Sequence, residues 1–478
     1  MGFAEYGDYD GLGLAELVKN KEVKPSEIID EAISRAEAIN PKLNFLIHKG
    51  YDQARELADS ADLPDGPFKG VPWLVKELAT AWEGMPMTNS SPYMKDLVAP
   101  FDSETLVRIK AGGMIPMGKS NAPELGWCLA TEPKLYGACL NPYDPAYTPG
   151  GSSGGSAAAI AARVLPIAEG SDGGGSIRVP ASHCNIFGLK PARGRVSLAP
   201  ALADFWYGGA LFHCMSRTVR DTAAFMDVTY GHLPGEPYQV APPPRPYSEE
   251  VGVSPGKLKI AMVTDVPDGC GPLHPDVKKA VEDCGKLMES LGHIVEPQPI
   301  PYDFWSFYKV YTDMTAATTA SWLDAMAGFV GREATWQDME PLYWTMVYKG
   351  KSFSAQDHAN HIEGIRQMSR DMLMKMNAYD TWLMPVMPTH ARPIGHYDMS
   401  LHVDEYDQTK MGPDCAYSAP FNASGSPAMS VPFSMSEGGL PIGVQFVGRD
   451  LDETTLIRIA SQIEEARPWA DNKPAICA

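Results

Sequence analysis

Two glycine- and serine-rich turns, separated by a short apolar stretch, carry the clearest chemical signal in the sequence. The first reads Gly-Gly-Ser-Ser-Gly-Gly-Ser over residues 150–156, and the second reads Asp-Gly-Gly-Gly-Ser over residues 172–176. Glycine lets a backbone adopt positive φ angles and approach a ligand closely. Consecutive amide groups in such a turn attract a negatively charged oxygen. Ser176, at the end of the second turn, is therefore predicted to be a nucleophile with its own oxyanion hole.

The base that would activate this serine is not fixed by the local sequence. Histidine is the usual partner of a catalytic serine, but His183 and His213 have no distinctive context and are interpreted as structural. A lysine can serve instead if its ammonium group is neutralised. Lowering a lysine pKa from about 10.4 to about 7 changes the protonation equilibrium by roughly 4.6 kcal/mol, and burial can supply much of this. Spacing alone leaves Lys76, Lys119 and Lys190 as candidates.

Nearly the whole chain resembles the amidase signature family. The similarity is strongest from Gly150 to Pro191, which contains both turns, and it continues through shorter motifs in family order. These motifs are Gly70–Lys76, Gly118–Glu124, Asn141–Tyr143, Gly188–Pro191, Arg217–Asp221, Pro420–Asn422 and Gly439–Gln445. The resemblance implies an α/β protein with the amidase signature fold. Such a fold has a mixed central β-sheet covered by helices on both faces (α/β/α), with a variable lid region.

The same resemblance implies a Ser-cisSer-Lys triad. Ser176 is the expected nucleophile, Ser152 the bridging serine on a cis peptide bond, and Lys76 the base. The separation of Ser152 from Ser176 fits the family pattern and favours Ser152 over Ser153. Protons would pass from Ser176 through Ser152 to Lys76 and return to the leaving amine, and water would then hydrolyse the acyl-enzyme.

The second turn is also expected to stabilise the oxyanion. The expected oxyanion hole consists of the backbone amides of Gly173, Gly174, Gly175 and Ser176. Asp172 and Arg178 are expected to brace this turn. Gly173 departs from the family pattern, because many members carry a larger residue there, often isoleucine or threonine. Glycine at this position would either widen the scissile pocket or loosen the turn.

The substrate is narrowed only in part. The segments Thr131–Pro133, Tyr136–Ala138 and Pro191–Arg195 are most similar to those of 6-aminohexanoate cyclic-dimer hydrolases and related xenobiotic amidases. Linear, aryl and cyclic amides and carbamates (a urethanase activity) all fit the same acyl chemistry, with ester hydrolysis as a side reaction. Aromatic residues are dense from Phe304 to Trp344 and favour a bulky or apolar substrate. The predicted substrate pocket contains Trp206, Tyr207 and Tyr417.

Two alternatives within the family remain. The first is the amidase subunit of a glutamyl-tRNA amidotransferase-type complex, which would need a partner subunit and a polar pocket. The second is a catalytically idle scaffold, which retention of Lys76, Ser152 and Ser176 disfavours. A lipase-type nucleophile elbow needs a strand directly before its serine, whereas residues 144–149 read as a loop.

Local patterns predict the elements that position these residues. Apolar residues at helical spacing predict a helix that begins at Ser26 and stops at Asn40-Pro41. Further predicted elements are strands at 70–76, 114–117 and 164–168, helices at 103–111 and 157–163, a hairpin of 428–433 with 442–447, and a last helix from about 452. One domain, 1–478, is expected, with its core at about 60–200 and 380–478. A less regular substrate-covering region is expected at about 200–380.

Composition limits the possible classes of partner. The net charge of −19 disfavours a nucleic-acid groove and attraction to anionic membranes. No apolar run reaches the roughly 20 residues needed to cross a bilayer, and the acidic first residues are unlike a secretory signal, so a cytoplasmic location is expected. The eight cysteines form no Cys-x-x-Cys pair and are expected to be free thiols. The sequence thus predicts no cofactor, no metal and a small-molecule amide or carbamate substrate, with a homodimer as one open option.

Overall fold

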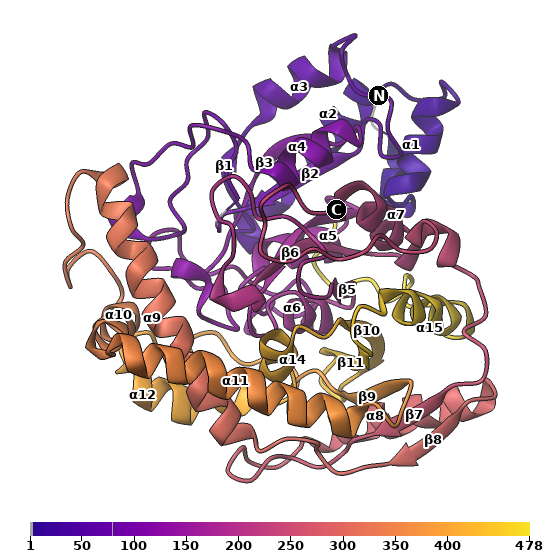
Figure 1. Cartoon of the computed structure of the whole chain (residues 1–478). Helices are drawn as coiled ribbons and strands as arrows, with labels where there is room; N and C mark the ends of the chain where they lie inside the picture. Colours follow the sequence, from indigo (N-terminus) through magenta and orange to yellow (C-terminus); the bar gives the residue numbers. More distant parts are fainter. Residues whose placement is uncertain (1–2, 79) are drawn as a thin grey trace.

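In the computed structural model, which describes residues 3–78 and 80–478, two β-sheets organise the chain (Figure 1). The strands are β1 (Leu46–Lys49), β2 (Pro72–Lys76), β3 (Ile115–Ser120), β4 (Ile167–Asp172), β5 (Phe187–Lys190), β6 (Leu211–Ser216), β7 (Lys259–Met262), β8 (Ile294–Pro297), β9 (Thr381–Pro385), β10 (Ala428–Met435) and β11 (Pro441–Gly448). The larger sheet has eight strands in the order β4-β6-β5-β10-β11-β9-β7-β8, and the smaller has the order β1-β3-β2. Because β7 is parallel to β8 and β9 while β4, β6, β5, β10 and β11 pair antiparallel, the predicted mixed sheet is confirmed.

Helices surround both sheets. They are α1 (Gly11–Lys19), α2 (Pro25–Leu43), α3 (Tyr51–Asp59), α4 (Glu104–Ala111), α5 (Gly154–Ala161), α6 (Arg178–His183), α7 (Val219–Thr229), α8 (Pro275–Ser290), α9 (Phe304–Val330), α10 (Pro341–Ser352), α11 (Ala355–Met376), α12 (Val403–Tyr406), α13 (Gly412–Asp414), α14 (Ala419–Ser424) and α15 (Glu453–Ala466). Short 3-10 turns occur at Ala4–Asp8, Pro92–Met94, Glu124–Gly126, Trp206–Gly208 and Tyr247–Glu250, and a π-helical turn at Asp407–Met411. None of the helices in the described residues has the length and apolar character needed to span a bilayer.

Alternating side chains along the central strands bury both faces of the larger sheet. In β9, Leu383 packs with residues of α7, α8 and α15, whereas its neighbours Trp382 and Met384 pack in the core that includes α9 and α10. Successive strand residues point to opposite faces of a sheet. Helices therefore cover this sheet on both sides, as predicted.

The contact between the two sheets positions two of the chemical groups. Strand β2 ends at Lys76 and lies against β4, which ends at Asp172. The carboxylate of Glu169 on β4 accepts a hydrogen bond of 2.7 Å from the backbone N–H of Lys76. The small sheet thereby delivers Lys76 to the strand that leads into the second glycine turn.

Several predicted boundaries are wrong. Helix α2 continues through Asn40-Pro41 to Leu43, because a proline near the C-terminus of a helix removes only one backbone hydrogen bond, and Asn44 at φ 53° ends it. The predicted strand at 164–168 begins only at Ile167. The left-handed conformation of Arg163 (φ 59°) reverses the chain there, and Val164 N–H bonds back to the Ala159 carbonyl.

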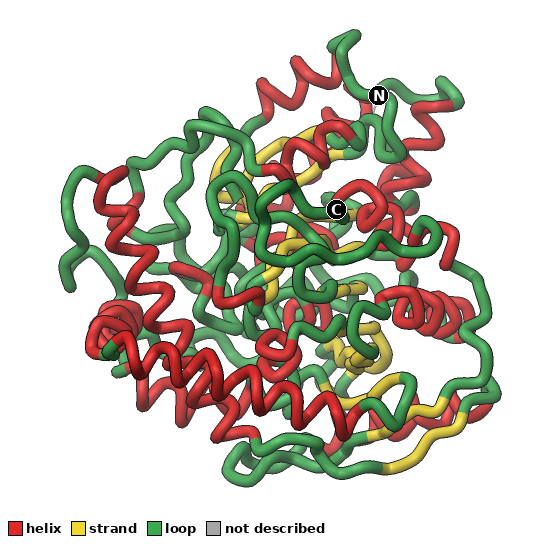
Figure 2. Tube along the Cα trace, viewed as in Figure 1, coloured by secondary structure: helices red, strands yellow, loops and turns green. Residues whose placement is uncertain are grey.

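The predicted substrate-covering region at about 200–380 is also corrected. It contains β6, β7 and β8, which belong to the larger sheet, together with α7 and α8. Only its later part lies away from the sheet, and it is regular: α9, α10 and α11 form a layer of packed helices. Figure 2 shows these long helices in red at the lower left, beside the yellow strands. The sequence did not predict these helices, because aromatic and methionine residues do not form a single apolar stripe at helical spacing there. Helix α9 is buried on more than one side.

Candidate active site

Ser152 and Ser176 lie in the two glycine turns, each directly before a helix. Ser152 follows a cis Gly151–Ser152 peptide bond and precedes α5, and Ser176 lies between β4 and α6. Gly175 has a φ of 132°, a conformation that side-chain-bearing residues rarely adopt. A Cβ atom at Gly175 would also lie 2.7 Å from Ser418 Oγ. The glycine before Ser176 is thus required both by backbone conformation and by packing.

Lys76 contacts the first turn and its neighbour strand through hydroxyl groups. Its Nζ lies 2.7 Å from Ser152 Oγ, 2.8 Å from Ser153 Oγ and 2.8 Å from Ser171 Oγ. The lysine side chain is fully buried. Ser171 was not predicted, although its position next to Asp172 was a usable signal. The structure therefore surrounds one buried amine with three hydroxyl groups.

Burial lowers the pKa of Lys76 to about 7. Loss of hydration disfavours the charged ammonium form, while the carboxylates of Glu169 and Asp172 act in the opposite sense. Burial likewise raises the pKa of Glu169 to about 7. An uncharged amine can accept a proton, so Lys76 is available as a base near neutral pH.

The other two candidate lysines have different environments. Lys119 is buried in an ion pair with Glu77, with 2.5 Å between Nζ and Oε2. Burial also lowers the pKa of Lys190 to about 7, but its Nζ donates to the Pro191 carbonyl at 2.7 Å. Among the described residues, neither of these lysines is hydrogen-bonded to a serine hydroxyl, whereas Lys76 is bonded to three.

A buried ion pair holds the second turn. Arg178 and Asp172 lie 2.9 Å apart (Nη2 to Oδ1), and both side chains are inaccessible to solvent. Asp172 also accepts hydrogen bonds from the backbone N–H groups of Gly175 (2.7 Å) and Ile177 (3.1 Å). The N–H of Gly175 is therefore already engaged, which removes it from the predicted oxyanion hole.

Two side chains fix the carbonyl groups of the same turn. Tyr311 donates to the Gly173 carbonyl at 2.7 Å, and Ser418 Oγ donates to the Gly174 carbonyl at 2.5 Å. In a trans peptide the carbonyl and the following N–H point in opposite directions. Fixing the Gly173 carbonyl therefore also fixes the direction of the Gly174 N–H.

A small cavity of about 80 Å³, with many aromatic residues in its wall, is also lined by Ser176, Ser152, Gly173 and Gly174. The other aromatic and apolar lining residues include Leu125, Trp127, Phe205, Trp206, Tyr308, Tyr311, Trp322 and Met411. Trp206 stacks on Phe205 with ring centroids 5.1 Å apart and meets Trp127 edge-on at 5.3 Å. These rings make much of the cavity wall apolar.

Two of the three predicted pocket residues lie elsewhere. Trp206 lines the cavity of Ser176, but Tyr207 does not, because both residues have positive φ angles and the chain turns sharply between them. Tyr417 is fully buried and donates to the Asp265 carbonyl at 2.7 Å. Trp127 and Phe205 were not predicted to line the pocket. Tyr311 and Trp322 belong to the aromatic-rich segment that was expected to favour a bulky or apolar substrate.

The two histidines lie outside this cavity. Burial lowers the pKa of His183 and of His213 to about 3, so both rings are neutral. Neither ring lines the cavity that contains Ser176. Their interpretation as structural residues agrees with this placement.

The space beside Gly173 is filled by Trp206. A Cβ atom built on Gly173 would overlap Cζ3 of the Trp206 indole. Glycine at this position therefore does not widen the cavity, because the indole of Trp206 occupies the space beside it. It makes room for an indole that covers the turn.

We expect Gly173→Ala to displace Trp206 and to destabilise the protein by about 1–3 kcal/mol, as overpacking generally does. Near-UV circular dichroism and urea denaturation measure the two effects. Gly174→Ala is the matched control, because a Cβ atom there meets nothing within 4 Å. Equal stability and equal near-UV spectra for the two variants would contradict this account of Gly173.

Comparison with known proteins gives a consistent result. The family model described as Amidase matches residues 27–457. The chain is 34% identical to the 6-aminohexanoate-cyclic-dimer hydrolase of Paenarthrobacter ureafaciens, over 98% of this chain and 96% of that protein. A solved structure of 6-aminohexanoate cyclic dimer hydrolase superposes with a TM-score of 0.93 at 33% identity and covers 98% of this chain and 99% of the other. A bacterial aryl acylamidase of the amidase signature family superposes with a TM-score of 0.87 at 25% identity and covers 98% of each chain.

Proposed function

The chain belongs to the amidase family, and on this premise we propose that it hydrolyses carboxylic amides through an acyl-enzyme formed on Ser176. One observation carries the proposal: the Nζ of Lys76 lies 2.7 Å from Ser152 Oγ inside a fully buried site. Ser152 and Ser176 line one cavity with the glycine turn. A base, two hydroxyl groups and backbone N–H donors are the groups that acyl transfer needs.

The proposed reaction begins with proton transfer from Ser176. The Ser176 oxygen attacks the amide carbonyl carbon while its proton moves to Ser152 Oγ, and the Ser152 proton moves to the neutral Lys76 amine. The tetrahedral intermediate collapses as Lys76 returns a proton to Ser152 and Ser152 passes its own proton to the leaving nitrogen, which departs as a neutral amine. Water then attacks the acyl-serine by the same route and releases the carboxylic acid.

The oxyanion is proposed to bind the N–H groups of Gly173, Gly174 and Ser176. Gly175 is left out because its N–H donates to Asp172. Tyr311 supports this arrangement indirectly, since its hydroxyl fixes the peptide that carries the Gly174 N–H. Such fixed donors need little reorganisation as negative charge develops, and this is the main source of oxyanion stabilisation.

The aromatic wall favours an uncharged substrate. Trp127, Phe205, Trp206 and Trp322 line the cavity, and burying an unpaired charged group among such rings is costly. We therefore propose a neutral amide flanked by hydrocarbon, a class that includes the cyclic dimer in the name of the relative with 34% identity. Carbamates and esters with similar flanks present the same carbonyl chemistry. Glutamine, the substrate of an amidotransferase subunit, would place its charged groups against this wall.

A small panel assayed with the purified protein alone tests the proposal. The panel contains an aryl acylamide, the 6-aminohexanoate cyclic dimer, an aryl carbamate and glutamine, with Ser176→Ala as the control. Turnover of any of the first three that is lost in Ser176→Ala supports a stand-alone hydrolase. Turnover of glutamine alone, or only after a partner is added, would replace this proposal with the amidotransferase subunit.

The activity should rise with pH and level off above about 7. Only the uncharged form of Lys76 can accept a proton, and its pKa is about 7. We expect kcat/KM to fall about tenfold for each pH unit below 7. A pH–rate profile on a neutral amide measures this, since the substrate itself does not titrate in that range.

The variant Glu169→Gln tests whether the acidic limb of the pH–rate profile reports Lys76 or Glu169, because both buried groups have a pKa of about 7. The carboxylate of Glu169 raises the pKa of Lys76, so its removal should shift the acidic limb toward lower pH without abolishing it. Loss of the limb in Glu169→Gln would instead assign the titration to Glu169.

A further inference from the structure

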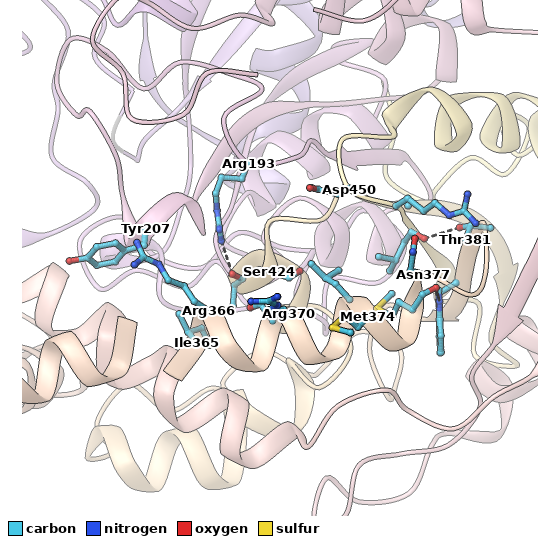
Figure 3. A pocket seen from close by; sticks show the side chains of 18 of the residues that line it. Arg193, Tyr207, Ile365, Arg366, Arg370, Met374, Asn377, Thr381, Ser424 and Asp450 are labelled. Atoms are coloured by element: carbon cyan, nitrogen blue, oxygen red, sulfur yellow. Dashed lines mark hydrogen bonds between the residues drawn. The ribbon is translucent and has the colours of Figure 1, made fainter. Parts of the chain in front are cut away.

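A second and larger cavity, of about 540 Å³, lies between α11 and the C-terminal ends of α14 and β11 (Figure 3). It does not contain Ser176, Ser152 or any residue of the second glycine turn. Trp206 belongs to the walls of both cavities. This cavity is therefore a neighbour of the candidate active site and not a part of it.

Three arginines gather around this cavity. Arg366 and Arg370 extend from α11, and Arg193 reaches toward them and toward Ser424 from the opposite side (Figure 3). Among the described residues, none of these three guanidinium groups has a carboxylate within ion-pair distance, whereas Arg449 in the same wall pairs with Asp380 at 3.0 Å. In a chain with a net charge of −19, three guanidinium groups without a carboxylate partner among the described residues of one cavity indicate a site for an anion.

Two buried polar atoms in the wall also lack hydrogen-bond partners among the described residues. One is Nε of Arg193, whose Nη2 already donates to the Ala423 carbonyl at 2.6 Å. The other is Oγ of Ser369 on α11, a side chain that is only 8% exposed. Leaving such groups unpaired is unfavourable. Both residues line the cavity, so the oxygens of an anionic ligand bound there would be candidate acceptors for these two donors.

The rest of the wall combines hydrocarbon with polar residues, which include Asn377, Thr381 and the carboxylate-bearing Asp450. Ile365, Leu373 and Met374 of α11 face Trp382 of β9 and Val447 of β11 across the cavity. An inorganic anion would leave this apolar surface uncovered, whereas a ligand with an alkyl or aryl chain would bury it. The wall therefore favours an organic anion over phosphate.

We propose that this cavity binds a small organic carboxylate, with the carboxylate among Arg193, Arg366 and Arg370 and an apolar chain against the hydrocarbon wall. Guanidinium groups donate two parallel hydrogen bonds to a carboxylate. Arg366 and Arg370 are solvent-exposed, so their side chains are free to turn onto the ligand without unfolding α11.

Octanoate is the probe, titrated calorimetrically into protein whose Ser176 has first been sulfonylated to block the catalytic cavity. We expect saturable one-site binding of octanoate with a Kd below about 10 mM. Octylammonium should not bind, and inorganic phosphate should bind at least about tenfold more weakly. Binding that disappears on sulfonylation would assign octanoate to the catalytic cavity and overturn the proposal. Phosphate binding as tight as that of octanoate would overturn the proposal that a hydrocarbon chain binds against the apolar wall.

The double variant Arg366→Gln/Arg370→Gln should weaken octanoate binding at least about tenfold. The matched control is Lys279→Gln/Lys286→Gln, which removes the same formal charge from exposed positions on α8 that pair only with Asp283 among the described residues. It should leave octanoate affinity unchanged. Equal weakening in both variants would show a net-charge effect and reject the cavity as the site.

Discussion

Lys76→Ala should lose nearly all amide hydrolysis at neutral pH, by about 10³-fold or more. General-base catalysis contributes about 10²–10⁴-fold in enzymes generally, and here the same amine would also return the proton to the leaving nitrogen. The effect should be smaller on an activated aryl ester, because an aryloxide leaves without being protonated. Turnover of an amide and of an aryl ester, measured side by side for the parent and Lys76→Ala, gives the loss of activity on each substrate.

Lys190→Met is the matched control for this variant. Lys190 is also fully buried and also has its pKa lowered to about 7, but among the described residues it donates to the Pro191 carbonyl and to no serine hydroxyl. It should keep amide turnover within about tenfold of the parent. If Lys76→Ala hydrolysed amides at a near-parental rate, the lysine-base mechanism would be wrong.

Arg178→Met should destabilise the protein by about 3–5 kcal/mol, the usual cost of removing one partner from a buried ion pair. Its guanidinium donates to both oxygens of Asp172 and also to Ser418, Gln445 and Asn422. Burial alone would raise the pKa of Asp172, and Arg178 more than offsets this, so the pKa of that carboxyl stays well below its usual value. Without Arg178, Asp172 is a buried charge with no ion-pair partner among the described residues.

Urea denaturation of Arg178→Met, Asp172→Asn and the double variant measures this coupling. The double variant should be less destabilised than the sum of the two single variants, because it leaves no unpaired charge. Additive losses would mean that the two side chains act independently. The single variants should also lose activity, since Asp172 holds the N–H groups of Gly175 and Ile177 on either side of Ser176.

The sequence determined the family and predicted which residues take part in the reaction. Ordered motifs with fixed residue types, above all the two glycine–serine turns, depend on local backbone demands that can be read directly. Alternating or helical periodicity likewise predicted β2, α4, the β10–β11 hairpin and α15 close to their observed bounds. These are local properties, and the chain carries them whatever its distant neighbours are.

Only the tertiary structure decided which groups meet. Spacing left Lys76, Lys119 and Lys190 equivalent, and Lys76 was preferred only through the family resemblance. The physical reason for that choice is the packing of β2 against β4, a contact between segments far apart in the chain. The three hydroxyl groups around Lys76 arise in the same way.

The lining of the cavity was also beyond the sequence. Composition pointed to aromatic residues, but the side chain of Tyr207 leaves the cavity because two successive residues adopt positive φ angles. Gly173 looked like an opening and is covered by Trp206, whose partner Trp127 comes from another part of the chain. Side-chain direction and long-range packing depend on the whole folded backbone, so no local pattern encodes them.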